Sequence, residues 1–313
     1  MATTDWIIGR GLLGGALARL SVNPVQATRI RWSDPELSLR DLADGLDELI
    51  VTGGRWRIFW SAGAGVTATS RSVLDAEVQV FTAFLAQLGR LPTDVLARGC
   101  IFLASSVGGV YAGNPAPPFS EGSAVEPISD YGRAKARMEN AIRDVAKASG
   151  IRCVVGRFTN LYGPGQDMSK GQGLISVIAR TYLTGQPAGV YVPLDTIRDY
   201  IFVDDAARVA HACMERIMDA APGAVVTKII GSSCGTSIGA LLGEFHRVMR
   251  RRPLIVLGSG NSAGQAPDLR VRSTVWTDLD GLAGTTLPAG IALTYGALLD
   301  AAVYPDSPGG SAD

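Results

Sequence analysis

A chain of 313 residues, of which 47% are apolar and 19% charged, can bury a substantial core in one large domain or two closely joined ones. Its formal net charge of zero argues against a protein that binds the phosphate backbone of nucleic acid, because such proteins present a basic surface. No apolar stretch reaches the roughly 18 residues needed to span a bilayer, so no membrane association is expected either.

The start of the chain and its cysteines bear on the cellular compartment. The first residues show no basic leader followed by a long apolar run, so no signal peptide is expected. The four cysteines are widely separated and mostly lie in apolar runs, which favours buried thiols over disulfides or a zinc site. We therefore expect a cytoplasmic protein without a bound metal.

The first half of the chain alternates short apolar runs with amphipathic helical patterns. Strands are expected at residues 6–8, 29–32, 57–60, 100–104 and 152–157, and helices at 12–20, 73–88 and 131–148. Because the strands are apolar throughout rather than alternating, both faces of their sheet should be covered. The pattern predicts an α/β fold with a doubly wound parallel sheet of the Rossmann type.

A glycine-rich loop joins the first strand to the first helix. Glycines permit a tight turn and let backbone N–H groups approach a pyrophosphate, which then sits at the positive end of the helix. The alternative is a plain glycine-rich turn. The loop residues expected to bind a dinucleotide are Gly9, Arg10, Gly11, Leu12, Leu13 and Gly14.

The end of the strand expected at 29–32 should indicate which dinucleotide binds. A carboxylate there would hold the ribose 2′-hydroxyl of NAD, but none occupies the strand tip. Arg31 and Ser33, together with Arg10, could meet a 2′-phosphate, whereas Asp34 could still reach the ribose. The cofactor is therefore expected to be NAD or NADP, with a slight preference for NADP. The alternative is that Arg10 and Arg31 are surface charges.

Two later strand ends complete the expected cofactor and substrate contacts. After the strand at 57–60, Ala62 and Gly63 are expected to contact the cofactor. After the strand at 100–104 come Ser105 and Ser106, and a hydroxyl at such a position can hydrogen-bond a substrate oxygen.

Tyr131 and Lys135 stand four residues apart at the start of a predicted helix, so the phenol and the ammonium project from one face. The neighbouring cation favours the phenolate, which makes Tyr131 a usable acid and base. Lys135 is one of only four lysines in a chain that otherwise prefers arginine. Arginine could not easily replace it, because its fork is bulkier and does not titrate.

The second half is looser in pattern, with a helix expected at 174–183, a strand at 227–231, a helix at 237–250 and a loop-rich end. We predict a dinucleotide-binding domain over residues 1–158, to which the chain returns near 190–212. Residues 159–189 and 213–300 are predicted to form a smaller α/β substrate-binding domain. Residues 301–313 are predicted to be a flexible tail, because the end of the chain is rich in Pro, Gly and Ser.

The motifs occur in a recognisable order. The glycine loop is followed by Ser-Ser-x-x-x-Val-Tyr from residue 105 and by Tyr-x-x-x-Lys from residue 131. Arg-Phe-Thr-Asn-Leu-Tyr-Gly-Pro-Gly then begins at residue 157, and Arg-Asp-Tyr-Ile-Phe-Val-Asp-Asp begins at residue 198. Over about residues 5–300 the chain resembles the NAD-dependent epimerase/dehydratase family of nucleotide-sugar enzymes, which are extended short-chain dehydrogenases/reductases.

The resemblance implies catalytic roles for four residues. Tyr131 would be the proton shuttle and Lys135 the ribose-binding residue that tunes it. Ser106, or alternatively Ser105, would be the hydroxyl partner.

The resemblance also implies the ligands and the assembly. The substrate would be a nucleotide-diphosphate sugar, with Asn160 and Arg198 on the diphosphate. The region 172–178 and Arg270 would line the substrate side. The alternatives to these binding roles are that Asn160 only caps a turn and that Arg198 forms an ion pair with Asp199. A homodimer is expected through the helices at 73–88 and 129–148.

Departures from the family pattern narrow the chemistry. The glycine loop is one residue shorter than usual, and Glu77 stands where relatives often have asparagine. Val107 and Gly108 replace the Asp-Glu pair of relatives that eliminate water, so 4,6-dehydration is disfavoured. The two histidines fall within helices and are expected to be packing or surface residues.

These features predict an enzyme that moves a hydride between a nicotinamide and a sugar carbon. Among the candidate functions, we favour a nucleotide-sugar epimerase that acts at C4. An NADPH-dependent nucleotide-sugar 4-ketoreductase is the alternative within the same chemistry. A non-catalytic dinucleotide-binding sensor is the alternative from another class, although such a protein has no need of the Tyr131–Lys135 pair.

Overall fold

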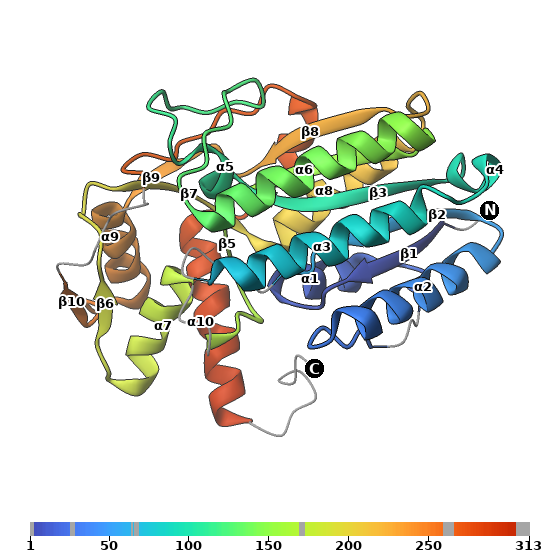
Figure 1. The fold of residues 1–313 in the computed structure, drawn as a ribbon. Coiled ribbons are helices and arrows are strands. Elements are labelled where there is room, and N and C mark those ends of the chain that lie inside the picture. The colour runs from blue at the N-terminus through green and yellow to red at the C-terminus, as the bar shows by residue number, and fades with distance from the viewer. Residues whose placement is uncertain are drawn as a thin grey trace.

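The computed structural model describes residues 3–25, 29–63, 65, 69–168, 173–258 and 266–304. A five-stranded sheet crosses the centre of the molecule in the order β1-β2-β3-β4-β8, and every pairing in it is parallel (Figure 1). Its strands are β1 Thr3–Ile8, β2 Arg55–Trp60, β3 Gly99–Ser106, β4 Arg152–Phe158 and β8 Val225–Ile230. The predicted α/β fold with a parallel sheet is confirmed.

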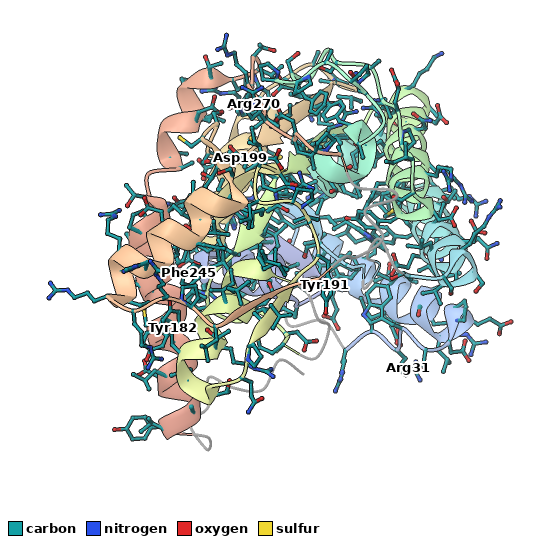
Figure 2. All side chains as sticks on the ribbon, turned by 90° about the vertical axis from the view of Figure 1, so that its left-hand side faces the viewer. Arg31, Tyr182, Tyr191, Asp199, Phe245 and Arg270 are labelled. Atoms are coloured by element: carbon teal, nitrogen blue, oxygen red, sulfur yellow. The ribbon has the colours of Figure 1, made fainter. Side chains whose placement is uncertain are left out.

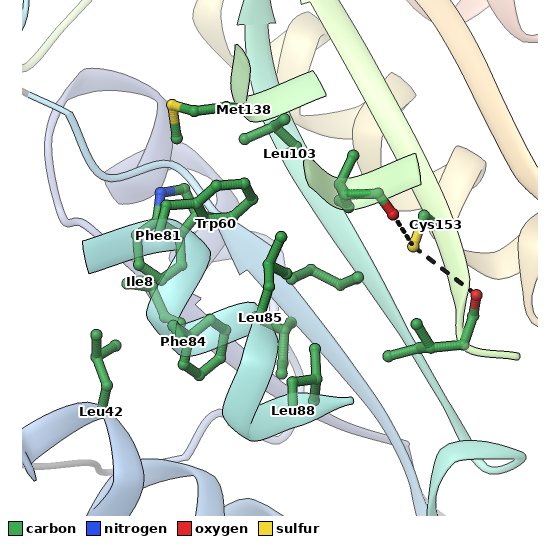
Figure 3. Packing of buried hydrophobic residues seen from close by; sticks show 14 of the residues in the cluster. Ile8, Leu42, Trp60, Phe81, Phe84, Leu85, Leu88, Leu103, Met138 and Cys153 are labelled. Atoms are coloured by element: carbon green, nitrogen blue, oxygen red, sulfur yellow. Dashed lines mark hydrogen bonds between the residues drawn. The ribbon is translucent and has the colours of Figure 1, made fainter. Parts of the chain in front are cut away.

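Helices cover both faces of the sheet because successive strand residues bury their side chains on opposite sides. On one face lie α2 Pro35–Val51, α3 Arg71–Leu88 and α6 Asp130–Ser149. On the other face, α1 Leu12–Leu20 packs against α8 Val203–Ile217. Figure 3 shows the first layer, where the Trp60 ring lies 4.8 Å from that of Phe81 and 5.2 Å from that of Phe84. The core thus fixes the strands whose carboxyl ends carry the predicted motifs.

A second group of elements lies beyond the carboxyl ends of the strands, on the left in Figure 1. Two small sheets occur there, β5-β7-β9 and β10-β6, and three helices pack around their own apolar core. The strands are β5 Asn160–Tyr162, β6 Ala188–Val190, β7 Ile197–Phe202, β9 Gly235–Ser237 and β10 Ile255–Leu257. The helices are α7 Leu174–Thr184, α9 Ile238–Met249 and α10 Leu287–Val303. The shorter helices α4 Thr93–Leu96, α5 Val107–Tyr111 and η2 Thr277–Leu282 complete the elements.

The strand expected at residues 29–32 is absent. The backbone N–H and guanidinium of Arg31 bind the Asp41 carboxylate instead, and the Asp34 side chain caps α2. Among the described residues on this side, β1 meets an isolated parallel bridge between Asp5 and Pro24. In the described part of the chain the opening strand is therefore the last strand on this side of the sheet, whereas in the usual doubly wound order it lies in the middle.

The second half also departs from expectation. The strand predicted near 227–231 joins the main sheet as β8, next to β4, and its last three residues, 228–230, are buried. Residues 225–230 therefore belong to the main sheet and not to the smaller domain predicted over 213–300. The predicted loop-rich end contains the 17-residue helix α10, so residues 301–303 are helical, and the rest of the predicted tail from 305 onward lies outside the described residues. No helix in the described ranges is long and apolar enough to cross a membrane.

The cysteines follow the prediction with one exception. Cys100, Cys153 and Cys213 are buried thiols, whereas Cys234 is exposed. Figure 3 shows the Cys153 sulfur between the carbonyl oxygens of Ile142 and Ile151, at 3.8 Å from each.

Candidate active site

A cavity of about 1120 Å³ opens at the carboxyl ends of β1 to β4. The glycine loop, residues 61–63, the end of β3 and the start of α6 line one part of it, and residues of β5 and β7 line another. Open α/β sheets bind ligands at this edge. The volume exceeds the roughly 300–1,000 Å³ of a pocket for one small molecule, so a cofactor and a second ligand can share it.

The glycine loop has the backbone geometry that a dinucleotide site needs. Gly9 has φ +90°, and a Cβ there would lie 2.4 Å from the Ala62 Cα atom. A Cβ on Gly14 would lie 1.8 Å from the Gly9 carbonyl oxygen, so α1 can approach the loop only with glycine there. A Cβ on Gly11 would meet nothing within 4 Å, and this residue caps α1 without a side chain. The first amides of α1 thus face open space in the cavity, which fits a pyrophosphate.

Tyr131 and Lys135 face the same cavity as the glycine loop. The Lys135 Nζ atom lies 5.7 Å from the centroid of the Tyr131 ring and donates a hydrogen bond to the Ala104 carbonyl oxygen at 3.2 Å. Ser129 caps α6 by accepting from the Gly132 N–H at 3.1 Å. The expected helical pairing of phenol and ammonium is therefore present, at the end of the central strand β3.

Close backbone packing fixes where Tyr131 lies. Helix α6 begins against α5, and a Cβ on Gly132 would come within 2.1 Å of the Gly109 carbonyl oxygen. A Cβ on Gly109 would lie 3.2 Å from the Tyr131 ring. These two glycines let the tyrosine approach the loop that follows Ser106.

The two serines after β3 have different partners, although both line the cavity. Ser105 is buried and donates to the Glu139 carboxylate at 2.6 Å. Ser106 accepts a hydrogen bond from the Gly109 N–H at 3.1 Å and keeps its own proton to donate. The arrangement favours Ser106 as the hydroxyl that reaches a substrate.

A buried ion-pair network below the serines was missed by the sequence reasoning. Glu139 is 1% exposed and pairs with Arg157 at 2.6 Å and with Arg143 at 3.2 Å. Arg157 also donates to the Tyr111 hydroxyl oxygen. Burial raises the pKa of Glu139, but the hydrogen bonds and charge of Arg157 outweigh burial, so its net pKa is lowered. The sequence does contain one sign of this network. Glu139 is a charged residue one helical turn after Lys135, between the apolar Met138 and Ile142.

At the far end of the cavity, Arg198 of β7 is 9% exposed. It donates to the Ile197 carbonyl oxygen at 2.8 Å, and no carboxylate of the described residues pairs with it. Burial lowers its pKa, and the charge interactions with Tyr200 and Asp268 only partly offset this effect. Asp199 instead accepts from the Ser232 and Cys234 backbone N–H groups, both at 2.8 Å, so the alternative of an Arg198–Asp199 ion pair is not what the structure contains.

The remaining predicted substrate residues fall into two groups. Asn160 lines the cavity and donates to the Asp199 carbonyl oxygen at 2.9 Å. Leu174 and Ile175 of the predicted region 172–178 line it too, whereas Gln172 lies outside the described residues. Arg270 lies outside the lining and pairs with Asp268 at 2.7 Å.

The predicted contacts of the adenosine also divide. Arg10, Ala62 and Gly63 line the cavity. Arg31, Ser33 and Asp34 do not line the cavity. They were expected at the end of a strand over residues 29–32, and that strand is absent. Figure 2 places the side chains of Arg31 and Arg270 toward opposite ends of the molecule.

The two histidines lie away from the cavity lining. His211 is buried against the Leu17 carbonyl oxygen, 3.1 Å from its Nε2 atom, and His246 is exposed on α9.

Comparison with known proteins places the chain among enzymes. Residues 62–227, more than half of the chain, match the model of the NAD dependent epimerase/dehydratase family. The chain belongs to this family. The match includes the Tyr131–Lys135 pair and the ends of β3 and β4, whereas the glycine loop after β1 lies before the matched residues.

Curated relatives in this family match over shorter segments. A dTDP-4-dehydro-6-deoxyglucose reductase of Escherichia coli is 33% identical over 124 residues, 39% of this chain and 39% of its own length. A UDP-glucose 4-epimerase of Mycolicibacterium smegmatis is 33% identical over 101 residues, 32% of each chain. The matched segment thus spans about two fifths or less of these relatives.

Solved structures match over nearly the whole chain. MoeE5 in complex with UDP-glucose and NAD has a TM-score of 0.78 at 19% identity and covers 96% of this chain and 100% of that one. The UDP-glucose 4-epimerase of Thermotoga maritima with UDP-glucose has a TM-score of 0.75 at 19% identity, with the same coverage. At these identities the likeness establishes the fold.

Proposed function

We propose that this family member is a nucleotide-sugar epimerase acting at C4 of the sugar. The observation that carries the proposal is the Tyr131–Lys135 pair, which shares one cavity with the glycine loop and with the buried cation Arg198. The UDP-sugars in the related structures support a nucleotide-diphosphate sugar as substrate. Among the described lining residues, Asp167 is the only carboxylate, so the Asp-Glu pair of the dehydratases has no counterpart here.

Tyr131 is the best proton acceptor among the cavity tyrosines. Burial raises the pKa of Tyr200 to about 12 and also raises that of Tyr162, so both stay protonated near neutral pH. Tyr131 instead faces the cavity beside the Lys135 ammonium, whose Nζ atom lies 5.7 Å from the centroid of the tyrosine ring. Proton removal from a sugar hydroxyl therefore falls to Tyr131.

The remaining residues bind and orient the substrate. A nicotinamide cofactor, when bound, supplies the capacity to take up a hydride and to give it back. Tyr131 takes the proton of the C4 hydroxyl, Ser106 hydrogen-bonds the same oxygen, and Arg198 neutralises the diphosphate. The sugar is left as a 4-ketone. Tyr131 returns the proton when the hydride is added to the opposite face, so atoms and electrons balance over the cycle.

A 4-ketoreductase is the second candidate. It would use the same residues in one direction only, with Tyr131 protonating the oxygen as hydride from NADPH reaches C4. The observation in its favour is the positive charge of Arg10 at the adenosine end of the cavity, which suits NADP.

Turnover with nucleotide sugars tests the proposal. The purified chain should interconvert the C4 epimers of a UDP- or dTDP-hexose with no net change in nicotinamide absorbance. Steady loss of NADPH absorbance with a nucleotide 4-ketosugar would assign the reductase instead. Tight nucleotide binding without conversion of either substrate would contradict both, and would leave a binding protein.

The homodimer through α3 and α6 stays a prediction. The large apolar side chains of α3 are used in the core, apart from the half-exposed Val73. Asp75 of α3 pairs with Arg137 of α6 across the outer surface. A partner would therefore meet a largely polar helix pair.

A further inference from the structure

We infer that the outer face of α10 is a surface on which a second copy of the chain packs, with the two α10 helices antiparallel. The helix belongs to the group of elements beyond the strand ends. It runs beside α7, with its last turns at the bottom of the view in Figure 1. The contact is separate from the α3–α6 face and requires nothing of the proposed function.

One side of α10 is already used within the chain. The residues on this side recur every three or four positions and are buried or half-buried against α7 and α9: Leu287, Ile291, Thr294 and Leu298. On the same side, a Cβ on Gly290 would lie 2.1 Å from the hydroxyl oxygen of Tyr162, which lines the cavity. The inner side therefore anchors α10 to the half of the molecule that carries β5 and β7.

The opposite side of α10 carries a second apolar stripe. Its residues are separated alternately by three and four positions, the spacing of a helix–helix contact: Ala289, Ala292, Gly296, Leu299 and Val303. Leu293 flanks the stripe and is 53% exposed, while Leu299 is 40% and Val303 56% exposed. A Cβ on Gly296 would meet nothing within 4 Å, so the middle of the stripe is open. A helix that is apolar on both sides is usually buried on both, so a partner is expected here.

The charge of this face favours another copy of the same surface as the occupant. Asp300 is the only charged residue of α10. The face therefore offers no charge complementarity to an acidic or a basic partner. It also lacks the basic side chains with which interfacial helices hold anionic bilayers. An uncharged apolar stripe is best covered by an equally uncharged one, and its own copy meets this condition.

The order of side chains along the stripe fits a twofold axis at Gly296. In an antiparallel pair, residues equally far before and after Gly296 face each other across the two copies. Large side chains then meet near the centre, and a small one meets a large one at each end: Leu293 with Leu299, and Ala289 with Val303. Asp300 faces Ala292, so the two carboxylates stay apart. Gly296 has no side chain, which lets the helix axes approach to about 8 Å.

Sedimentation velocity of the full chain at about 1–100 µM measures the association. One helix pair buries less than the roughly 800 Å² per partner of a standard interface, so we expect a dimer that dissociates in the micromolar range. Leu299→Glu should weaken it by at least about 100-fold, because the symmetry places the charge in the contact twice and one buried leucine alone contributes about tenfold. Val73→Glu of α3 is the matched control, since Val73 is half-exposed too, and should leave the association unchanged.

Oxidative cross-linking locates the axis. A cysteine at Gly296 would lie beside its own copy, within the roughly 7 Å between Cα atoms that a disulfide allows. Gly296→Cys should therefore yield a covalent dimer under mild oxidation. Gly243→Cys is the control, because Gly243 lies on α9 and a Cβ there also meets nothing within 4 Å. The exposed Cys234 is common to both variants and to the native chain.

Equal urea midpoints verify that the Leu299 and Val73 variants are folded. A native chain that stays monomeric at about 100 µM, well above a micromolar dissociation constant, would overturn the α10 contact. So would an association that survives Leu299→Glu, one that is lost only with Val73→Glu, or cross-linking of Gly243→Cys as efficient as that of Gly296→Cys. None of these readouts uses a sugar substrate, so failure of the α10 contact and failure of the proposed function remain distinguishable.

Discussion

Tyr131→Phe should reduce turnover of the nucleotide sugar by about 10²- to 10⁴-fold, the usual contribution of a positioned acid or base. The substitution removes one oxygen and keeps the aromatic ring that lies 5.7 Å from the Lys135 ammonium. It also leaves the glycine loop and the Gly109–Gly132 contact intact. Cofactor affinity should therefore stay within a few-fold of the native value.

The matched control is Tyr304→Phe, because Tyr304 is 63% exposed after the end of α10 and lies outside the cavity. Steady-state rates and dinucleotide titrations of the two variants provide the measurement. A Tyr131→Phe protein that turns over at the rate of the control would remove this phenol from the mechanism.

Glu139→Gln should destabilise the fold by about 3–5 kcal/mol near neutral pH, the cost of breaking a buried ion pair from one side. The Glu139 carboxylate is 1% exposed and accepts hydrogen bonds from Ser105, Arg157 and Arg143. Glutamine keeps the shape but leaves the Arg157 guanidinium, itself 3% exposed, without its counter-charge. Urea unfolding of the native and variant chains measures the difference.

The pH dependence of this loss of stability shows whether it comes from the broken ion pair or from altered packing. The folded-state pKa of Glu139 lies below its ordinary value of about 4.3, so the stabilisation is complete above that value and is lost as the pH falls through the folded-state pKa. The gap between native and variant should therefore shrink below about pH 4. Asp144→Asn on the exposed side of the same helix is the control and should cost little. A gap independent of pH, or no larger than that of the control, would count against the ion pair.

The first half of the fold could be predicted because its strands and helices are locally unambiguous. The helix at 12–20 was predicted with the observed bounds, and the helices predicted at 73–88 and 131–148 agree within two residues, whereas α2 was not predicted. The run Arg-Ile-Arg-Trp at 29–32 misled the prediction because its pairing with Asp41 is a contact ten residues away that no local pattern shows. Helix α10 was missed since it is apolar nearly all round and so lacks the periodicity of an amphipathic helix.

The site was predictable where a residue's role depends on its immediate neighbours. Tyr131 and Lys135 are brought together by one helical turn, and the glycine loop is set by its own backbone. Arg31 and Arg270 could not be placed because nearby carboxylates, Asp41 and Asp268, bind them outside the cavity.

Hydride transfer at the sugar can be followed with a nucleotide hexose that carries deuterium at C4. If the cavity works as proposed, the epimerised product made in ordinary water keeps the deuterium at C4, because it leaves and returns as hydride while only the hydroxyl proton passes through Tyr131. Loss of the deuterium to water during epimerisation would contradict this account, because it would mean that the carbon is deprotonated and that no hydride moves.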